Sequence, residues 1–381
     1  MAQPMQGVKV VDLSRILAGP LSTMTLGDFG AEVLKIESRA GDETRGWLPP
    51  VTSDGVSTYY SAVNRNKQAI IVDFKNSDEL HELRKIIDDA DVLVQNFRPG
   101  VLTQFGLDYE SVKETNPRLV YCSISGFGDR AGASLPGFDL LVQAVGGLMS
   151  ITGEPEGTPS KVGVALVDVL AAQNATTGIL LALREREQSG LGQKVDISLM
   201  TSMLAGLTNQ ASSTVATGES PPRLGNAHPS IAPYETFATA DGVMVIAVGN
   251  NRQFSALVSE LGVPELASDK RFVENLERVK HRRELKELIE EITVQDSAIR
   301  WTSRLMQAGV PAGKVNSVAE ALELAVTLGL EPLVSIEDSA TGRRSTQVAS
   351  PINLSRSKAE YRLVPPALGE HQQTFLGTAK L

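Results

Sequence analysis

The chain has 381 residues and a formal net charge of −9, with 42% hydrophobic and 21% charged residues. This length predicts two domains or one elaborated domain. The acidic balance argues against nucleic acid or an anionic membrane as a main partner. We find neither a signal-peptide pattern nor an apolar run of the ~20 residues that span a bilayer. We therefore expect a cytoplasmic protein, with a mitochondrial or other organellar matrix as the open alternative.

Runs rich in β-branched residues alternate with helical patterns over residues 1–200. Such alternation is typical of an α/β layer with a largely parallel sheet. The predicted strands are 9–13, 32–36, 69–74, 91–94, 119–124 and 194–197. The predicted helices are 20–29, 77–89, 108–116, 139–149 and 169–188. The last two helices are apolar over most of their circumference, so we expect both to be deeply buried.

The pair Pro221-Pro222 marks a break, after which the pattern changes. Strands are predicted at 234–237 and 243–248, and charged amphipathic helices at 252–261, 281–293 and 297–308. The fold expected is α/β, with a large Rossmann-like parallel-sheet domain and a smaller α+β domain. The predicted domain ranges are 1–220 for the first part of the large domain, 221–317 for the small domain and 318–381 for a return to the large domain.

Several common motifs are absent from the sequence. There is no GxGxxG after the first strand, no GxxxxGK[ST] and no GxSxG, so a dinucleotide site, a phosphate-binding loop and a nucleophile elbow are not indicated. HExxH and CxxC spacings are also missing, and we expect no metal site. The single cysteine, Cys122, lies in an apolar run and is expected to be a buried, inert thiol.

Asp168 is the most unusual acidic residue, because it stands inside the apolar run VGVALVDVL just before a predicted helix. It can be read as the N-cap of that helix and, compatibly with that role, as a carboxylate that the helix dipole keeps ionised. In a cleft, such a poorly hydrated carboxylate is a competent nucleophile toward a thioester. Asp139 begins the other apolar helix, as a cap or as an orienting or proton-accepting carboxylate near Asp168.

Polar and basic residues follow two of the predicted strands. Asn96, Phe97 and Arg98 come after the strand 91–94, where loops of a parallel sheet line the ligand crevice. Arg39 and Arg45 follow the strand 32–36. These residues suit an amide contact, a stacking ring and phosphate partners, although solvated surface arginines are an equally open reading of Arg39 and Arg45.

In the smaller domain, two segments carry candidate residues. Gly249 and Asn250 follow a strand, either as a helix N-terminus capped by asparagine or as a mobile lid whose N–H groups stabilise an oxyanion. His228 is either catalytic or a structural or substrate-gating residue, and we favour the second.

Together these segments resemble the class III coenzyme A transferases of the CaiB/BaiF type, which include formyl-CoA transferase and the succinyl-CoA-dependent dicarboxylate transferases. The similarity covers nearly the whole chain. Its distinctive segments are LGDFGAEVLKIE, GDETRGW, VQNFRPGVLTQFGLDYE, GFDLLVQAVGGLMSITG, the VDV around Asp168, and GNAHPSIAPYETFATADG.

The resemblance implies a CoA-transferase acting on an acyl-CoA and a small carboxylic acid. Asp168 would form mixed anhydrides and an aspartyl-CoA thioester. The chain would form an intertwined homodimer, and no metal is implied. Residues that match the ligand cradle of the family are Arg15, Leu17, Ala18, Arg39, Asn96, Phe97, Gly137 and Asp139. Leu17, His228 and Tyr234 are expected to set the size of the substrate pocket.

Differences from relatives of this fold bear on the reaction. Acyl-CoA racemases have a histidine where this chain has Phe138, and its absence removes the acid/base partner that a racemase is expected to need. A racemase or isomerase is therefore only the second reading. Formyl-CoA transferase has a glutamine at the position of Leu17, which argues against oxalate and formate. The segment around His228 is most similar to the succinyl-CoA:dicarboxylate branch. A third reading is a catalytically silent CoA-binding protein, against which the presence of Asp168 argues.

Overall fold

The computed structural model describes residues 3–339 and 342–376 and divides into two compact units. The first unit comprises 1–148, 161–219 and 331–381, and the second comprises 149–160 and 220–330. Relative to the predicted ranges, the second unit also includes 149–160 and 318–330. The domain ranges themselves stay a prediction.

A six-stranded sheet forms the centre of the first unit, and every strand runs parallel to its neighbours. The strand order is β3-β2-β1-β4-β5-β6, so the direction of winding reverses between β1 and β4. This is a doubly wound arrangement, and it confirms the predicted Rossmann-like sheet. The strands are β1 Lys9–Asp12, β2 Glu32–Glu37, β3 Lys67–Ile71, β4 Val92–Gln95, β5 Val120–Ser125 and β6 Lys194–Ser198.

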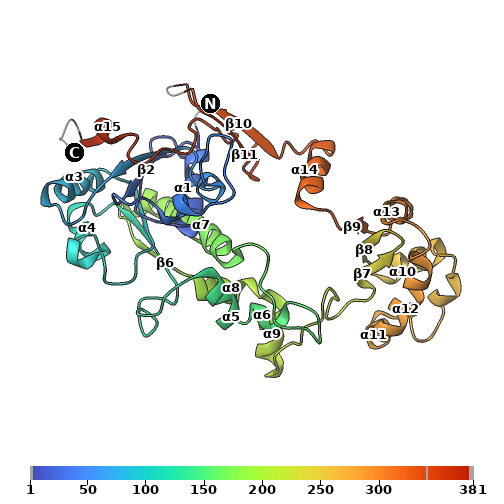
Figure 1. Cartoon of the computed structure of the whole chain (residues 1–381). Coiled ribbons are helices and arrows are strands. Elements are labelled where there is room, and N and C mark those ends of the chain that lie inside the picture. The colour runs from blue at the N-terminus through green and yellow to red at the C-terminus, as the bar shows by residue number, and fades with distance from the viewer. Residues whose placement is uncertain (1–2, 340–341, 377–381) are drawn as a thin grey trace. The chain divides into compact units, whose positions relative to one another are not determined.

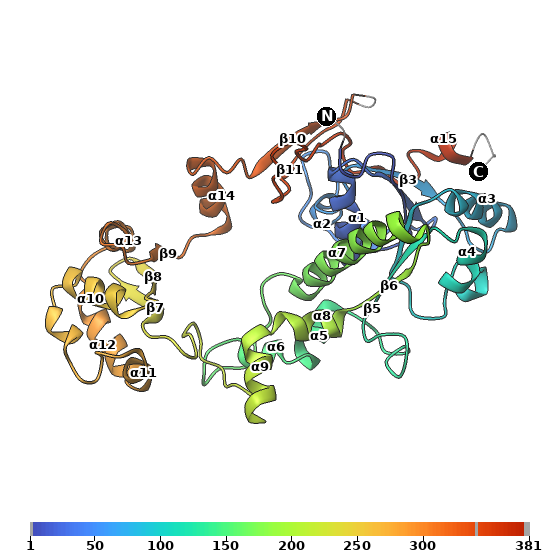
Figure 2. The ribbon, with the colours of Figure 1, turned by 180° about the vertical axis from the view of Figure 1, so that it is seen from behind.

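Helices cover both faces of this sheet because its strands are apolar on both sides. Val10 of β1 packs toward α1 (Ala18–Asp28) and α7 (Leu166–Ser189), which lie side by side in Figure 1. Its neighbour Val11 packs toward α3 (Ser77–Asp88) and α4 (Tyr109–Thr115) on the opposite face (Figure 2). Cys122 is fully buried in the α1/α7 core, as predicted.

The remaining elements of the first unit are short. The prediction of one helix over 139–149 is wrong in its extent. The observed helix ends at Gly146, and a new one begins after Gly147, whose φ is +89°. The short elements of the first unit are η1 Glu43–Gly46, α2 Thr58–Ser61, η2 Thr103–Phe105, α5 Asp139–Val145, α8 Leu199–Gly206, α9 Thr208–Thr217, the antiparallel pair β10 Leu333–Glu337 and β11 Arg344–Val348, and α15 Gln372–Leu376. Helix α6 Leu148–Ile151 falls mostly within 149–160, which belongs to the second unit.

The prediction that the two apolar helices are deeply buried is also wrong for the single chain. On α5, Leu140 and Val145 are each 54% exposed, and on α7 Leu181 is 66% exposed. By length and composition α7 could cross a membrane, which corrects the expectation that no stretch of the chain is long and apolar enough. The inward face of α7 nevertheless packs on the sheet through Ala171, Ala175 and Ile179, as in a core helix.

The second unit is an antiparallel sheet of three strands with helices packed against it. Phe237, Phe254 and Trp301 belong to its separate hydrophobic core. This agrees with the smaller α+β unit predicted from the sequence. Its elements are β7 Tyr234–Thr239, β8 Gly242–Ala247, β9 Ala312–Lys314, α10 Asn251–Glu260, η3 Pro264–Ala267, α11 Asn275–Lys280, α12 Arg282–Thr293, α13 Ala298–Gln307 and α14 Val318–Thr327.

Candidate active site

A cavity of about 430 Å³ opens at the carboxyl ends of the strands in the first unit. The loops after β1, β2, β4 and β5 form its walls, and the start of α7 contributes Asp168. Loops at this edge, beside the point where the winding of a doubly wound sheet reverses, form its usual ligand crevice.

The wall after β1 is held by a pair of hydrogen bonds to the loop after β4. The backbone N–H of Arg15 donates to Oδ1 of Asn96 at 2.9 Å, and Nδ2 of Asn96 donates to the Arg15 carbonyl at 2.7 Å. The Arg15 guanidinium lies 5.3 Å from the centroid of the Phe97 ring and pairs with Glu43. Its Nε is buried with no hydrogen-bond partner among the described residues, while 44% of the side chain is exposed and can meet an anionic ligand.

Four further predicted residues line the same cavity: Leu17, Ala18, Arg98 and Gly137. Leu17 is the N-cap of α1, and the exposed Arg98 adds a second cation to the wall. Gly137 touches Gly126 so closely that a Cβ on either residue would lie 2.5 Å from the Cα of the other. Only glycine fits this contact, which closes the loop leading to Asp139.

Asp168 is the third residue of α7, and the N-cap of that helix is Ala165, without a side-chain cap. The N-cap reading of Asp168 is therefore wrong. Oδ1 of Asp139 instead accepts from the backbone N–H groups of Val167 at 2.8 Å and of Asp168 at 3.4 Å. Its Oδ2 accepts from Gln143 at 2.7 Å. Asp139 thus caps a helix that begins many residues later and places its charge beside Asp168.

The carboxyl group of Asp168 is partly buried where it lines the cavity. Burial, and then the negative charge of Asp139, raise the pKa of Asp168 to about 7. The expectation that the helix dipole keeps this group ionised is therefore corrected. Near neutral pH the carboxyl is present in both forms, and the ionised form is poorly solvated, as suits a nucleophile.

Two aromatic residues at this site were not predicted from the sequence. Trp47 lines the cavity, and its ring meets that of Tyr59 edge to face, with 4.8 Å between centroids. Burial, together with the charges of Asp168 and Asp139, raises the pKa of Tyr59 to about 12. The phenol therefore stays protonated within electrostatic reach of both carboxylates. Trp47 stands in the quoted segment GDETRGW, which could have identified it.

Arg39 lies in a neighbouring cavity of about 420 Å³, which shares Arg15 and Phe97 with the first. Its guanidinium pairs with Glu79 at 3.1 Å and is more than half exposed. Arg45 is different, because it binds both carboxylate oxygens of Glu37 and stacks on Tyr60, 3.9 Å from the ring centroid. Arg45 is therefore a structural arginine.

The other predicted site residues belong to the second unit. Nδ1 of His228 accepts from the Ser230 N–H at 3.1 Å, and its ring centroid lies 5.3 Å from that of Tyr234. Asn250 is the N-cap of α10, and the Gly249 N–H donates to Oε1 of a glutamine in that helix at 2.8 Å. The capping reading of Asn250 is confirmed. A lid at Gly249 and Asn250, and a role of His228 and Tyr234 toward substrate, stay predictions.

No group of three or more His, Cys, Asp or Glu side chains that could hold a metal ion occurs within 3–339 and 342–376. What the cavity offers is a partly buried carboxyl with a raised pKa, a second carboxylate that caps the helix carrying it, and two arginines. This set fits covalent chemistry on an anionic acyl compound.

Comparison with known proteins decides the family. Residues 5–372 match the family described as "CoA-transferase family III". The chain belongs to this family. A succinate–glutarate CoA-transferase of Agrobacterium fabrum is 40% identical over 98% of this chain and 95% of the relative. An acetyl-CoA:oxalate CoA-transferase of Acetobacter aceti is 40% identical over 87% of this chain and 85% of the relative.

A solved structure agrees with this assignment. A CaiB/BaiF family protein from Brucella suis superimposes with a TM-score of 0.87 at 40% identity and covers 98% of both chains. The resemblance inferred from the sequence is thereby confirmed, as are the fold class and the enzyme class, a class III CoA-transferase.

Proposed function

We propose that this CoA-transferase moves CoA from an acyl-CoA thioester to a carboxylic acid through covalent intermediates on Asp168. The observation that carries the proposal is the position of this partly buried carboxyl at a cavity lined by Arg15 and Arg98. An ionised carboxylate with little hydration attacks an acyl carbon more readily than one in bulk water.

The reaction sequence is balanced without an external reagent. An oxygen of Asp168 attacks the thioester carbon, and CoA leaves as a thiolate, which gives a mixed anhydride. The thiolate then attacks the aspartyl carbonyl, releases the donor acid and forms an aspartyl-CoA thioester. The acceptor carboxylate repeats these steps in reverse and leaves as its CoA thioester. In each step an anionic nucleophile displaces an anionic leaving group, so no net proton transfer is needed.

The surroundings of the cavity support CoA as the ligand. CoA carries phosphates, and the overall charge of the chain, −9, would repel them without local cations. Arg15 and Arg98 stand in the first cavity and Arg39 in the second, which the first adjoins through Arg15 and Phe97. We propose that CoA extends across both cavities, with its thioester toward Asp168.

For the substrates, we propose a succinyl-CoA donor and a dicarboxylate acceptor. The names of the two relatives pair succinate with glutarate and acetyl-CoA with oxalate. Succinyl-CoA and acetyl-CoA, each mixed with glutarate, oxalate or acetate, should give the fastest transfer for succinyl-CoA with glutarate, measured by liquid chromatography of the CoA esters. Transfer to acetate alone would contradict the dicarboxylate proposal. Deuterium exchange at the acyl α-carbon without any acceptor would favour a racemase.

We further propose that two copies of the chain form a homodimer. The chain leaves Leu140, Val145 and Leu181 exposed on helices of its first unit, and such apolar side chains are typical of a surface that a partner covers. Sedimentation equilibrium should give twice the 40.7 kDa of one chain. Leu181→Glu should weaken this association, whereas Val318→Glu, on the exposed side of α14, should not. A monomer at every concentration would contradict the proposal.

A further inference from the structure

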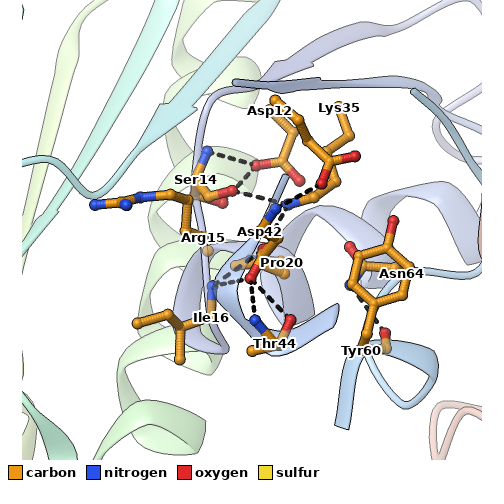
Figure 3. A network of polar contacts seen from close by, with 12 residues as sticks. Asp12, Ser14, Arg15, Ile16, Pro20, Lys35, Asp42, Thr44, Tyr60 and Asn64 are labelled. Atoms are coloured by element: carbon orange, nitrogen blue, oxygen red, sulfur yellow. Dashed lines mark hydrogen bonds and ion pairs between the residues drawn. The ribbon is translucent and has the colours of Figure 1, made fainter. Parts of the chain in front are cut away.

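A cluster of four ionised residues is buried behind the wall of the active-site cavity, and Figure 3 labels Asp12, Lys35 and Asp42 of this cluster. The side chains of Asp12, Lys35, Asp42 and Lys67 have no exposed surface. Lys35 Nζ lies 2.9 Å from Oδ2 of Asp42, and Lys67 Nζ lies 3.0 Å from Oδ2 of Asp12. A buried ion pair is by itself weak evidence for stability, because desolvation opposes the attraction between the charges. The role of this cluster therefore has to be inferred from the segments that it holds in place.

Asp42 binds the loop that follows β1. Its carboxylate accepts from the backbone N–H of Ile16, with Oδ2 at 3.2 Å and Oδ1 at 3.3 Å (Figure 3). Ile16 has φ of +71°, a conformation that β-branched residues rarely adopt and that persists only where the surroundings impose it. Lys35 supports the same loop, because its Nζ donates to the Ser14 carbonyl at 2.9 Å.

The same carboxylate also binds the second wall of the cavity. Asp42 is the N-cap of η1, and its Oδ1 accepts from the Thr44 N–H at 3.0 Å and from Oγ1 of Thr44 at 2.8 Å. The segment that it caps carries Glu43 and Trp47, which both line the cavity. Glu43 in turn pairs with Arg15 of the first wall.

The electrostatics keep Asp42 in the form that makes all these bonds. Burial favours the neutral acid, but the charge of Lys35 and the hydrogen bonds from Lys35 and Thr44 outweigh it and lower the pKa of Asp42. A carboxylate accepts from several donors at once, whereas the corresponding amide has one acceptor oxygen. Only the ionised acid can therefore bind Ile16, Thr44 and Lys35 together.

We propose that Asp42 is a positioning residue for CoA, a buried carboxylate that couples the Arg15–Ile16 wall to the Glu43–Trp47 wall of the cavity. The inference rests on the proposed function, because CoA is the ligand whose site the two walls form. Loss of the carboxylate frees both walls and weakens CoA binding.

Asp42→Asn tests the inference, with Asp28→Asn as the matched control. Asp28 is also buried and binds Nη2 of Arg65 at 2.7 Å. Neither residue lines the first cavity, and the Asp42 side chain, which borders the second, has no exposed surface with which to touch CoA. The probe is CoA, titrated by calorimetry at a temperature at which both variants are folded. Asp42→Asn should weaken binding by about tenfold or more. Asp28→Asn should stay within about twofold of the wild type.

A spectroscopic readout separates positioning from general loss of stability. The chain has two tryptophans, so Trp301→Phe leaves Trp47 as the only one. In this background, Asp42→Asn should increase acrylamide quenching of Trp47 fluorescence, and Asp28→Asn should not. If Asp42→Asn does not fold, Thr44→Val removes one bond to Asp42 without unpairing a charge. It should then weaken CoA binding by about threefold, with a thermal midpoint lowered by no more than about 4 °C.

Wild-type affinity in Asp42→Asn, or an equal loss in Asp28→Asn, would overturn the inference. So would wild-type affinity in Thr44→Val where Asp42→Asn does not fold. A wild-type protein that does not bind CoA contradicts the proposed function itself. The fluorescence of Trp47 then decides the positioning role, and unchanged quenching in Asp42→Asn overturns it.

Discussion

Replacing Asp168 by asparagine or alanine is expected to abolish CoA transfer, lowering kcat by a factor on the order of 10⁴ or more. The reason is chemical: neither side chain offers a carboxylate oxygen to form the mixed anhydride, and the cavity of the first unit offers no other carboxylate in the same setting. Asp139 cannot replace it, because both of its oxygens are engaged by N–H groups. The measurement is steady-state transfer from succinyl-CoA to glutarate, with the products separated by chromatography.

The thermal stability of Asp168→Asn provides the control for folding. The pKa of Asp168 is raised to about 7 in the folded protein, above its usual value of 3.8. Ionisation of this group therefore costs stability progressively as the pH rises from about 4 to about 7, and the loss is complete above pH 7. Asp168→Asn should be more stable than the wild type at pH 8 by on the order of a few kcal/mol, and similar to it at pH 4. Substantial residual activity in this stable variant would contradict the role of Asp168.

The second expected result is a steep dependence of activity on pH. Only the ionised form of Asp168 attacks a thioester, so kcat/KM should rise about tenfold for each pH unit below about 7 and level off above it. A pH-independent rate between pH 5 and 8 would show that this group does not titrate in the free enzyme. The profile is measured with a fixed, low concentration of acyl-CoA.

Asp139→Asn should shift this profile toward lower pH. The substitution removes the negative charge that helps to raise the pKa of Asp168, while the amide oxygen can still cap Val167. Asp108→Asn is the matched control, because Asp108 also caps a helix, accepting from Ser111, but does not line the cavity. A profile that moves equally in both variants would exclude a direct effect of Asp139 on Asp168.

Much of the fold could be predicted because the strands of the large sheet are short β-branched runs between helical patterns. The strand at Val120–Ser125 was predicted within one residue at each end. The helices α8 and α9 were missed, since α8 follows β6 without a break and α9 is mostly polar. The exposure of Leu181 could not be predicted either, because the composition of a helix shows that it is apolar but not which other elements pack against it.

Site residues could be predicted only where a local sequence segment identifies them. Asp168, Asn96 and Arg15 were found from unusual placement or family resemblance, and all three line the cavity. The cap that Asp139 provides for α7 and the approach of Tyr59 to Asp168 were not predicted. Both depend on tertiary contacts between segments far apart in the chain, which periodicity and residue spacing do not reveal.

The most direct test of the mechanism is to locate the covalent intermediate. Protein incubated with succinyl-CoA is treated with hydroxylamine or borohydride, digested and analysed by peptide mass spectrometry. We expect the hydroxamate or the reduced side chain at Asp168 alone, and none in Asp168→Asn. A label at another residue, or rapid transfer with no label on the protein, would contradict the proposal that Asp168 carries the acyl group and CoA.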